Sequence, residues 1–123
     1  AMSDSAVPQY PCPVCGYVVF HERPGCYEIC PICFWEDDLV QLRFVDYPGG
    51  ANEPSLIQAQ KNFLELGAVE TRFREHVRAP RATDRRLEQQ WIPFDPSRHF
   101  IEESVQGLDY GDTYPDDSTT LYY

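Results

Sequence analysis

The chain has 123 residues, with 20 acidic and 10 basic side chains and a formal net charge of −10. This length corresponds to about one domain with a modest core. A surface of this charge repels phosphate backbones and attracts basic partners, so a general nucleic-acid binder is disfavoured. The sequence shows neither a signal peptide nor an apolar run of about 18 residues, and we therefore expect a cytoplasmic protein without a membrane partner.

Two Cys-Pro-x-Cys motifs are the strongest signal in the sequence. Cys12-Pro13-Val14-Cys15 is followed, after fourteen residues, by Cys30-Pro31-Ile32-Cys33. A tight turn over each motif directs two thiolates toward one point, and two such turns form the tetrahedral cage that a structural Zn²⁺ requires. Cysteines in a chain without a leader also favour metal ligation over disulfides. We predict one structural zinc bound by Cys12, Cys15, Cys30 and Cys33, with Cys26 outside the site.

Iron is the alternative metal. The first motif followed by Gly16-Tyr17, with a later Cys-Pro-x-Cys, is similar to rubredoxin-type iron sites, and thiolate ligation alone does not separate the two metals. Closed four-sulfur sites are most often structural zinc, and the sequence shows no site for an electron-transfer partner. Zinc is therefore favoured, and a rubredoxin-like electron carrier is kept as a minor alternative.

The residues between the motifs predict a β-hairpin. Residues 17–20 are β-branched and aromatic, residues 26–29 can return antiparallel, and residues 21–25 supply the turn. Gly16 follows the first motif, where a positive φ lets backbone N–H groups approach the sulfurs. Phe34 occupies the corresponding place after the second motif.

An aromatic and acidic run follows the second motif. One interpretation is a contact surface for a basic partner, in which a rigid turn presents Trp35, Glu36, Asp37 and Asp38. The other is that Phe34 and Trp35 cover the core while the acids are solvated or begin a helical turn. The first is our partner-binding hypothesis, and the second is the simpler structural explanation.

Two helices are predicted after the Pro48-Gly49-Gly50 break. Ser55 and Gln58 form a capping box, apolar residues share one face through Leu66, and Gly67 suits the C-terminal cap, so a helix is expected over 55–66. A second helix is expected over 69–77, because Val69, Phe73 and Val77 repeat every four residues.

Six of the ten basic residues lie between Arg72 and Arg86. They suggest an alternative function, a nucleic-acid-associated zinc ribbon acting through this strip. Glu75 and Asp84 interrupt the strip and no aromatic residues are interleaved for base stacking, so nucleic acid remains an unlikely partner. An exposed face that partly neutralises the acidic ribbon is the simpler interpretation.

The C-terminal third divides into three parts. Residues 79–90 are polar and typical of a linker or frayed helix, whereas Trp91-Ile92-Pro93-Phe94 and His99-Phe100-Ile101 supply apolar area for docking onto the domain. Residues 102–123 carry six acids, no Lys or Arg and four tyrosines, which indicates either disorder or a partner-binding strip.

The expected fold class is α+β: a small zinc-ribbon β-hairpin module packed against two short helices, with an irregular acidic C-terminal extension. The expected divisions are a flexible N-terminus over 1–9, a zinc-ribbon domain over 10–90, and a docking segment with its acidic tail over 91–123.

No catalytic constellation is apparent. A closed four-cysteine zinc has no position left for water, and His21, His76 and His99 are isolated in the sequence. The zinc deaminase signature is absent, because His21-Glu22 are adjacent and follow Cys12. The first motif also lacks the βαβ pattern of a thioredoxin-like dithiol. We expect a protein that is not an enzyme.

The chain resembles the cysteine-rich CPCC family over about residues 10–85. The resemblance rests on Tyr10 to Tyr17, on Tyr27 to Asp38 with its Phe-Trp-Glu-Asp-Asp ending, on Gly49-Gly50-Ala51-Asn52, and on the region from Asn62 to Phe73. The family pattern is Cys-Pro-Cys-Cys, and this chain has Val14 at the third position.

The resemblance implies a small bacterial accessory protein, and some members are immunity partners of toxins. Together with the acidic charge, it leads to our functional expectation: a non-enzymatic, zinc-binding protein-interaction module, an immunity protein that binds and neutralises a bacterial toxin or another basic protein partner.

Overall fold

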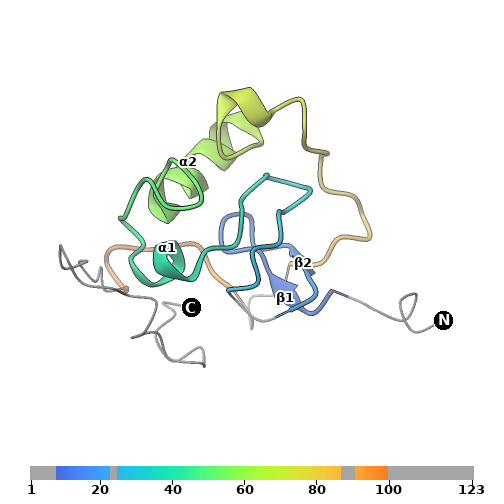
Figure 1. Cartoon of the computed structure of the whole chain (residues 1–123). Coiled ribbons are helices and arrows are strands. Elements are labelled where there is room, and N and C mark those ends of the chain that lie inside the picture. Colours follow the sequence, from blue (N-terminus) through green and yellow to red (C-terminus); the bar gives the residue numbers. More distant parts are fainter. Residues whose placement is uncertain (1–7, 23–24, 87–90, 100–123) are drawn as a thin grey trace.

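The computed structural model describes residues 8–22, 25–86 and 91–99. Its elements are β1 (Tyr10–Pro11), β2 (Val18–Phe20), α1 (Leu39–Arg43), α2 (Leu56–Leu66) and a 3₁₀ turn η2 (Thr71–Phe73). Figure 1 shows α2 on one side of the molecule and the hairpin on the other, with the loop of the second motif between them. The predicted α+β class, with one small hairpin and two helices, is confirmed.

Each Cys-Pro-x-Cys motif forms its own turn. β1 and β2 flank the first motif and pair antiparallel, with Tyr10 opposite Phe20. Around the second motif, Ile29 pairs with Glu36 in an isolated bridge. The predicted hairpin between 17–20 and 26–29 does not form among the described residues, because each strand pairs across its own motif instead.

Helix α1 was not expected from periodicity, and Asp38 explains where it begins. Its Oδ1 accepts a hydrogen bond from the Val40 N–H at 2.9 Å, which satisfies one of the free donors of the first turn. Its Oδ2 accepts from the Ala51 N–H at 2.9 Å. Asp38 therefore both begins the helix and positions the loop that leads to α2.

Helix α2 begins and ends where the sequence predicts. The Ser55 hydroxyl accepts from the Gln58 N–H at 3.2 Å, and Gly67 ends the helix in the left-handed region with φ 77°. Leu56 and Ala59 are fully buried in the core on the inner face. The capping residues and the apolar face thus both specify the same helix.

The predicted helix over 69–77 is wrong. Only the 3₁₀ turn Thr71–Phe73 forms, and Glu70 before it is extended. The Val69 N–H donates to the Cys33 carbonyl at 2.9 Å, and the Arg78 N–H donates to the Pro31 carbonyl at 3.1 Å. Because both ends of the segment are bound to the second motif, the four-residue repeat does not produce an α-helix.

The segment predicted as a linker returns to the hairpin. The Val18 N–H donates to the Arg85 carbonyl at 2.8 Å, and Tyr17 pairs with Arg86 in a bridge, so this segment lies beside β2. In Figure 1 the chain after α2 (yellow) runs down one side of the molecule to reach the strands.

Residues 91–99, the described part of the predicted docking segment, contact the domain, whereas Phe100 and Ile101 lie outside the described residues. Trp91 is buried, and its indole N–H donates to the Pro13 carbonyl at 2.8 Å. The Phe94 N–H donates to the Gln60 side chain at 3.0 Å, which joins this segment to α2. The expectations for residues 1–7 and 102–123 lie outside the described residues, and Gln9 already pairs with Phe20 beside the hairpin.

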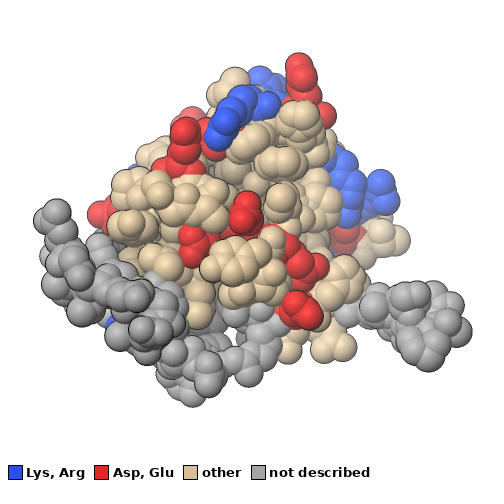
Figure 2. Space-filling view, in the orientation of Figure 1, with Lys and Arg blue, Asp and Glu red and all other residues tan. Residues whose placement is uncertain are grey.

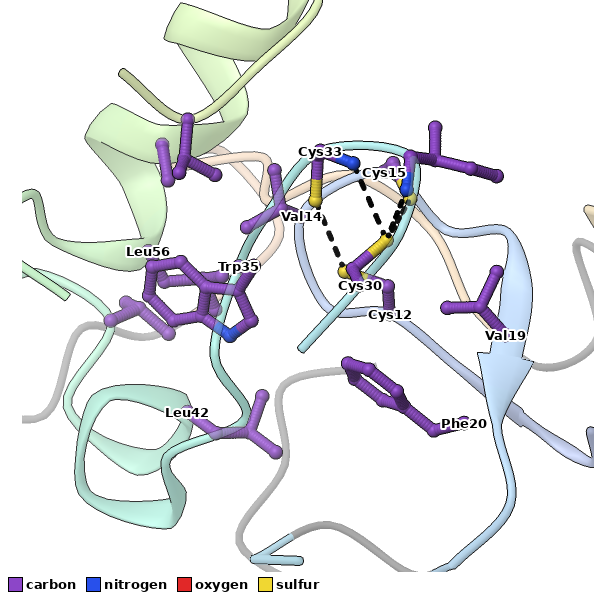
Figure 3. Packing of buried hydrophobic residues seen from close by; sticks show 14 residues of the cluster. Cys12, Val14, Cys15, Val19, Phe20, Cys30, Cys33, Trp35, Leu42 and Leu56 are labelled. Carbon is purple, nitrogen blue, oxygen red and sulfur yellow. Dashed lines mark hydrogen bonds between the residues drawn. The ribbon is translucent and has the colours of Figure 1, made fainter. Parts of the chain in front are cut away.

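One core cluster surrounds the two motifs (Figure 3). Trp35, Leu42 and Leu56 lie on the side of the helices, and Val19 and Phe20 lie on the side of the hairpin. Within the part of the chain that the structure describes, no helix has the length and apolarity needed to span a membrane.

Candidate metal centre

The two motifs bring four sulfur atoms together. Figure 3 shows the four thiols facing one another at the centre of the core. The Sγ atoms of Cys12 and Cys33 lie 3.5 Å apart, those of Cys15 and Cys30 lie 3.7 Å apart, and all four lie within 4.8 Å of one another. Tetrahedral zinc with Zn–S bonds of about 2.3 Å requires S–S separations of about 3.8 Å. The donor set therefore fits a tetrahedral metal ion, and the prediction of a metal site on these four cysteines is supported.

The two turns have matching backbone geometry. The Gly16 N–H donates to the Cys12 carbonyl at 2.8 Å, and the Phe34 N–H donates to the Cys30 carbonyl at 2.9 Å. Gly16 has φ 78° and Phe34 has φ 73°, so both occupy the left-handed region. The positive φ expected at Gly16 is confirmed, whereas Phe34 adopts a conformation that strains a side-chain-bearing residue. Contact between the Phe34 and Phe73 rings, with centroids 4.4 Å apart, offsets that strain.

Backbone N–H groups also approach the sulfurs. The N–H groups of Ile32 and Cys33 point at Cys30 Sγ, at 3.3 Å and 3.4 Å. Such donors stabilise a thiolate, because they place partial positive charge beside the sulfur. This contact belongs to the second motif, where the turn folds its own amides over its first cysteine.

Burial and the hydrogen bonds between the thiols together set the thiol pKa values when no metal is bound. All four cysteines are fully buried. Burial raises the pKa of Cys12 and Cys33 well above the ordinary value. Burial acts in the same direction on Cys30, but hydrogen bonds from Cys12 and Cys15 outweigh it and lower the pKa of Cys30. Metal binding must therefore displace protons from buried thiols, which makes the metal affinity dependent on pH.

Cys26 lies outside the cluster, as expected. Its Sγ lies 3.3 Å from Glu28 Oε2 and 3.2 Å from Asp37 Oδ2. Burial and the hydrogen bond to Asp37 raise the pKa of the Cys26 thiol to about 12. The third position of the first motif is filled by Val14, which is buried in the core. Neither the departure at Val14 nor the extra cysteine changes the set of four ligands.

The acidic contact surface predicted after the second motif does not form. Trp35 is fully buried, and Asp37 and Asp38 are 1% and 6% exposed. Asp37 Oδ2 accepts from the backbone N–H groups of Gly25 and Cys26 at 2.7 Å and 2.8 Å. These carboxylates bind backbone donors that the loops leave unpaired, which is why they point inward. The partner-binding prediction is therefore wrong for Trp35, Asp37 and Asp38.

Glu36 is the member of this run that retains surface. It is half-buried, and its backbone is bound on both sides by Asn52. The Glu36 N–H donates to Asn52 Oδ1 at 2.9 Å, and Asn52 Nδ2 donates to the Glu36 carbonyl at 2.8 Å. Asn52 therefore joins the loop before α2 to the edge of the second motif.

The arginine strip is partly engaged within the chain. Arg72 pairs with Glu70 at 3.1 Å, and Arg78 forms two hydrogen bonds with Asp84, at 2.7 Å and 3.0 Å. Arg86 donates from Nε to the Cys15 carbonyl at 2.9 Å. These contacts agree with a strip that neutralises local acidic charge.

The three histidines are dispersed. His21 Nδ1 lies 3.0 Å from Glu28 Oε1. The His76 ring packs against Phe34 with centroids 5.6 Å apart, and His99 Nδ1 accepts from the Asp95 N–H at 2.8 Å. None of the three belongs to the group of possible metal ligands found among the described residues.

Sequence reasoning missed the contribution of Trp91 and Arg86 to the site. The Arg86 guanidinium lies over the rings of Tyr17 and Trp91, with its carbon 5.1 Å and 5.2 Å from the two centroids. A Cβ on Gly16 would lie 2.2 Å from the Trp91 ring. Gly16 is therefore required for φ and also for close packing. No local sequence pattern predicts the contact between Gly16 and Trp91, because these residues are 75 positions apart in the chain.

With the site defined, the chain can be assigned to a family. The model of the Cysteine-rich CPCC family matches residues 10–84, and the chain belongs to this family. The match covers both motifs, α1, α2 and the segment that returns to the second motif. Comparison with curated proteins found none that matches this chain.

Gly16→Ala should lower the free energy of unfolding by about 2–4 kcal/mol, because an added Cβ collides with Trp91 and also meets a positive φ. Gly49→Ala is the matched control, since Gly49 has φ 81° and open space around it, and should cost about 1 kcal/mol. Denaturant unfolding of the metal-bound proteins measures both values. Equal losses of unfolding free energy in the two variants would show that Trp91 does not pack on Gly16.

Replacing a ligand should abolish metal binding, whereas replacing the neighbouring cysteine should not. We expect Cys30→Ser to lower the metal affinity at least about 100-fold and to unfold the region around the motifs, since the free energy of structural metal binding is folding free energy. Cys26→Ser should retain about one metal per chain. Native mass spectrometry measures the metal content of each variant. Loss of metal from Cys26→Ser would contradict the assigned ligands.

The alkylation rate of Cys26 should keep rising with pH beyond the range of an ordinary thiol. With a pKa of about 12, the thiolate fraction grows about tenfold per pH unit between pH 8 and 11. Glutathione in the same solution is the control and should level off near pH 9. The raised pKa means that the fold favours the protonated thiol, so this stabilisation is lost as pH rises from 9 through 12. A plateau near pH 9 for Cys26 would contradict the shift.

Proposed function

We propose that this CPCC-family protein is a non-enzymatic protein-interaction module held together by one structural zinc, and that it acts as an immunity protein against a basic toxin. The observation that carries the proposal is the closed four-cysteine cluster at the centre of the core. All four ligands are buried and their sulfur atoms lie within 4.8 Å of one another, so a zinc bound by all four would have no position left for water or substrate.

The cluster supports a scaffold role on energetic grounds. A chain with a modest core gains little net stability from burial alone, whereas structural zinc contributes about 10–16 kcal/mol in small peptides. A metal-stabilised framework holds its exposed loops in a fixed geometry. Pre-organised loops favour tight protein binding, since less conformational entropy is lost on association.

Charge supports a basic partner. The net charge of −10 steers positively charged proteins toward the surface. Because Asp37 and Asp38 are buried and Glu36 is half-buried, the contact must rely mainly on other acids. Exposed acids among the described residues include Glu22, Asp46, Glu53, Glu65 and Glu75. Figure 2 shows acidic side chains spread over the displayed face, with Lys and Arg toward its edges.

The nucleic-acid alternative has less support. Arg72 and Arg78 are already paired with carboxylates, and Arg86 is bound to the first motif. A strip that has to release internal ion pairs gains less from phosphate contacts. Binding of RNA at low salt that weakens steeply as salt rises would restore this alternative.

The first test is metal content with a visible spectrum, on protein purified without added metal. We expect about one zinc in a colourless chain, released only when the fold is lost. A red, iron-containing protein would contradict the zinc assignment. It would instead favour a rubredoxin-like electron carrier in a reducing compartment such as the cytoplasm.

The partner test uses the protein encoded by the neighbouring gene, if it is basic. Replacing Glu22, Glu53, Glu65 and Glu75 by Lys changes the charge from −10 to −2, and the association rate should fall at least about tenfold at low salt. Replacement of the same four residues by Gln is the control, with a charge of −6 and a smaller effect. An association rate independent of both charge and salt would contradict the proposed acidic surface.

A further inference from the structure

A groove lies between α2 and the docked segment at 91–96. Its volume is about 700 Å³, within the range of ligand and peptide pockets. Most of its lining is apolar, and the main contributors are Ile57, Phe63, Leu64, Trp91, Ile92 and Phe94. The groove is separate from the four-cysteine cluster, since no ligand cysteine lines it.

The apolar lining is not fully covered by the described residues. Leu64 is 80% exposed on α2, although it lines the groove. An apolar surface of this kind on a small protein marks a place where another segment or molecule binds, because burial of apolar area is the main favourable term in association. We therefore expect the groove to bind a segment or molecule with apolar side chains.

The charges of the lining restrict the occupant further. Lys61 and Arg86 line the groove and are both exposed, and Asp46 is the single acid in the lining. Arg86 Nε already donates to the Cys15 carbonyl, so its remaining guanidinium N–H groups and the Lys61 ammonium are the cationic donors of the groove. Gln60 is already committed, since it donates to the Pro13 carbonyl and accepts from the Phe94 N–H. In a chain of net charge −10, this local excess of positive charge favours an occupant that is acidic as well as apolar.

The chain itself carries a segment of this composition. Residues 100–123 contain six acids and no Lys or Arg, and Leu121-Tyr122-Tyr123 follow Asp116 and Asp117 closely. The segment begins at residue 100, four positions after Pro96, the last residue of the groove lining. A span of about 25 residues reaches up to about 80 Å, so the distance is no obstacle. Attachment to the same chain also gives an effective concentration on the order of millimolar.

We propose that Leu121-Tyr122-Tyr123 of the same chain binds in this groove, with Asp116 and Asp117 beside Lys61 and Arg86. Leu and Tyr side chains cover the exposed apolar lining, and the two carboxylates meet the two cations. The acidic segment then serves as an intramolecular occupant.

The test is photo-cross-linking of the full chain at micromolar concentration. p-Benzoylphenylalanine replaces Leu64, and mass spectrometry maps the captured residues within the monomer. We expect cross-links to residues 116–123. The same amino acid at Arg74, an exposed residue of the 3₁₀ region outside the groove, is the control and should capture none of them. Metal content confirms that both variants are folded.

Charge variants locate the contact. Lys61→Glu should lower the cross-linking yield from position 64 at least about threefold. The yield of the chain with Lys61 intact should also fall as the salt concentration rises. Arg74→Glu makes the same charge change outside the groove and should leave the cross-linking yield unchanged. Absence of cross-links to residues 116–123, cross-links only between two chains, or a yield insensitive to Lys61→Glu would each overturn the proposal. Cross-links between chains would assign the groove to a second copy instead.

Discussion

The convergence of four cysteine sulfurs is the constraint on which the rest of this structure depends. Two turns of matching geometry place the thiols at tetrahedral spacing, and the core is built around them. A metal ion there joins residues 12 and 33, and its binding free energy is comparable in size to the whole net stability of a small domain.

The second half of the chain depends on the same centre through backbone contacts. Val69 binds the carbonyl of Cys33, Arg78 binds that of Pro31, and Trp91 binds that of Pro13. The chain after α2 therefore follows the outside of both motifs and returns to the hairpin. This arrangement turns a short metal-binding ribbon into a domain that reaches residue 99, and it creates the apolar groove against α2 as a consequence.

Burial of the acidic run changes where function is sought. Asp37 and Asp38 accept hydrogen bonds from backbone donors of the loops, so these carboxylates hold the framework together and do not face solvent. The electrostatic character of the protein then comes from acids dispersed over the exposed surface. One exception to this character is the groove, where Lys61 and Arg86 accompany apolar side chains.

The sequence by itself determined the four ligands, the positive φ at Gly16 and the limits of α2, because each is encoded in residues close together: a motif, a glycine after it, or a capping pair. Tertiary structure decided the rest. The repeat at Val69, Phe73 and Val77 favours a helix, but hydrogen bonds to the second motif hold that segment in another conformation. The inward direction of Asp37 and the packing of Trp91 on Gly16 also depend on contacts between distant residues. Local spacing carries no information about such contacts, since they join residues that only the tertiary structure brings together.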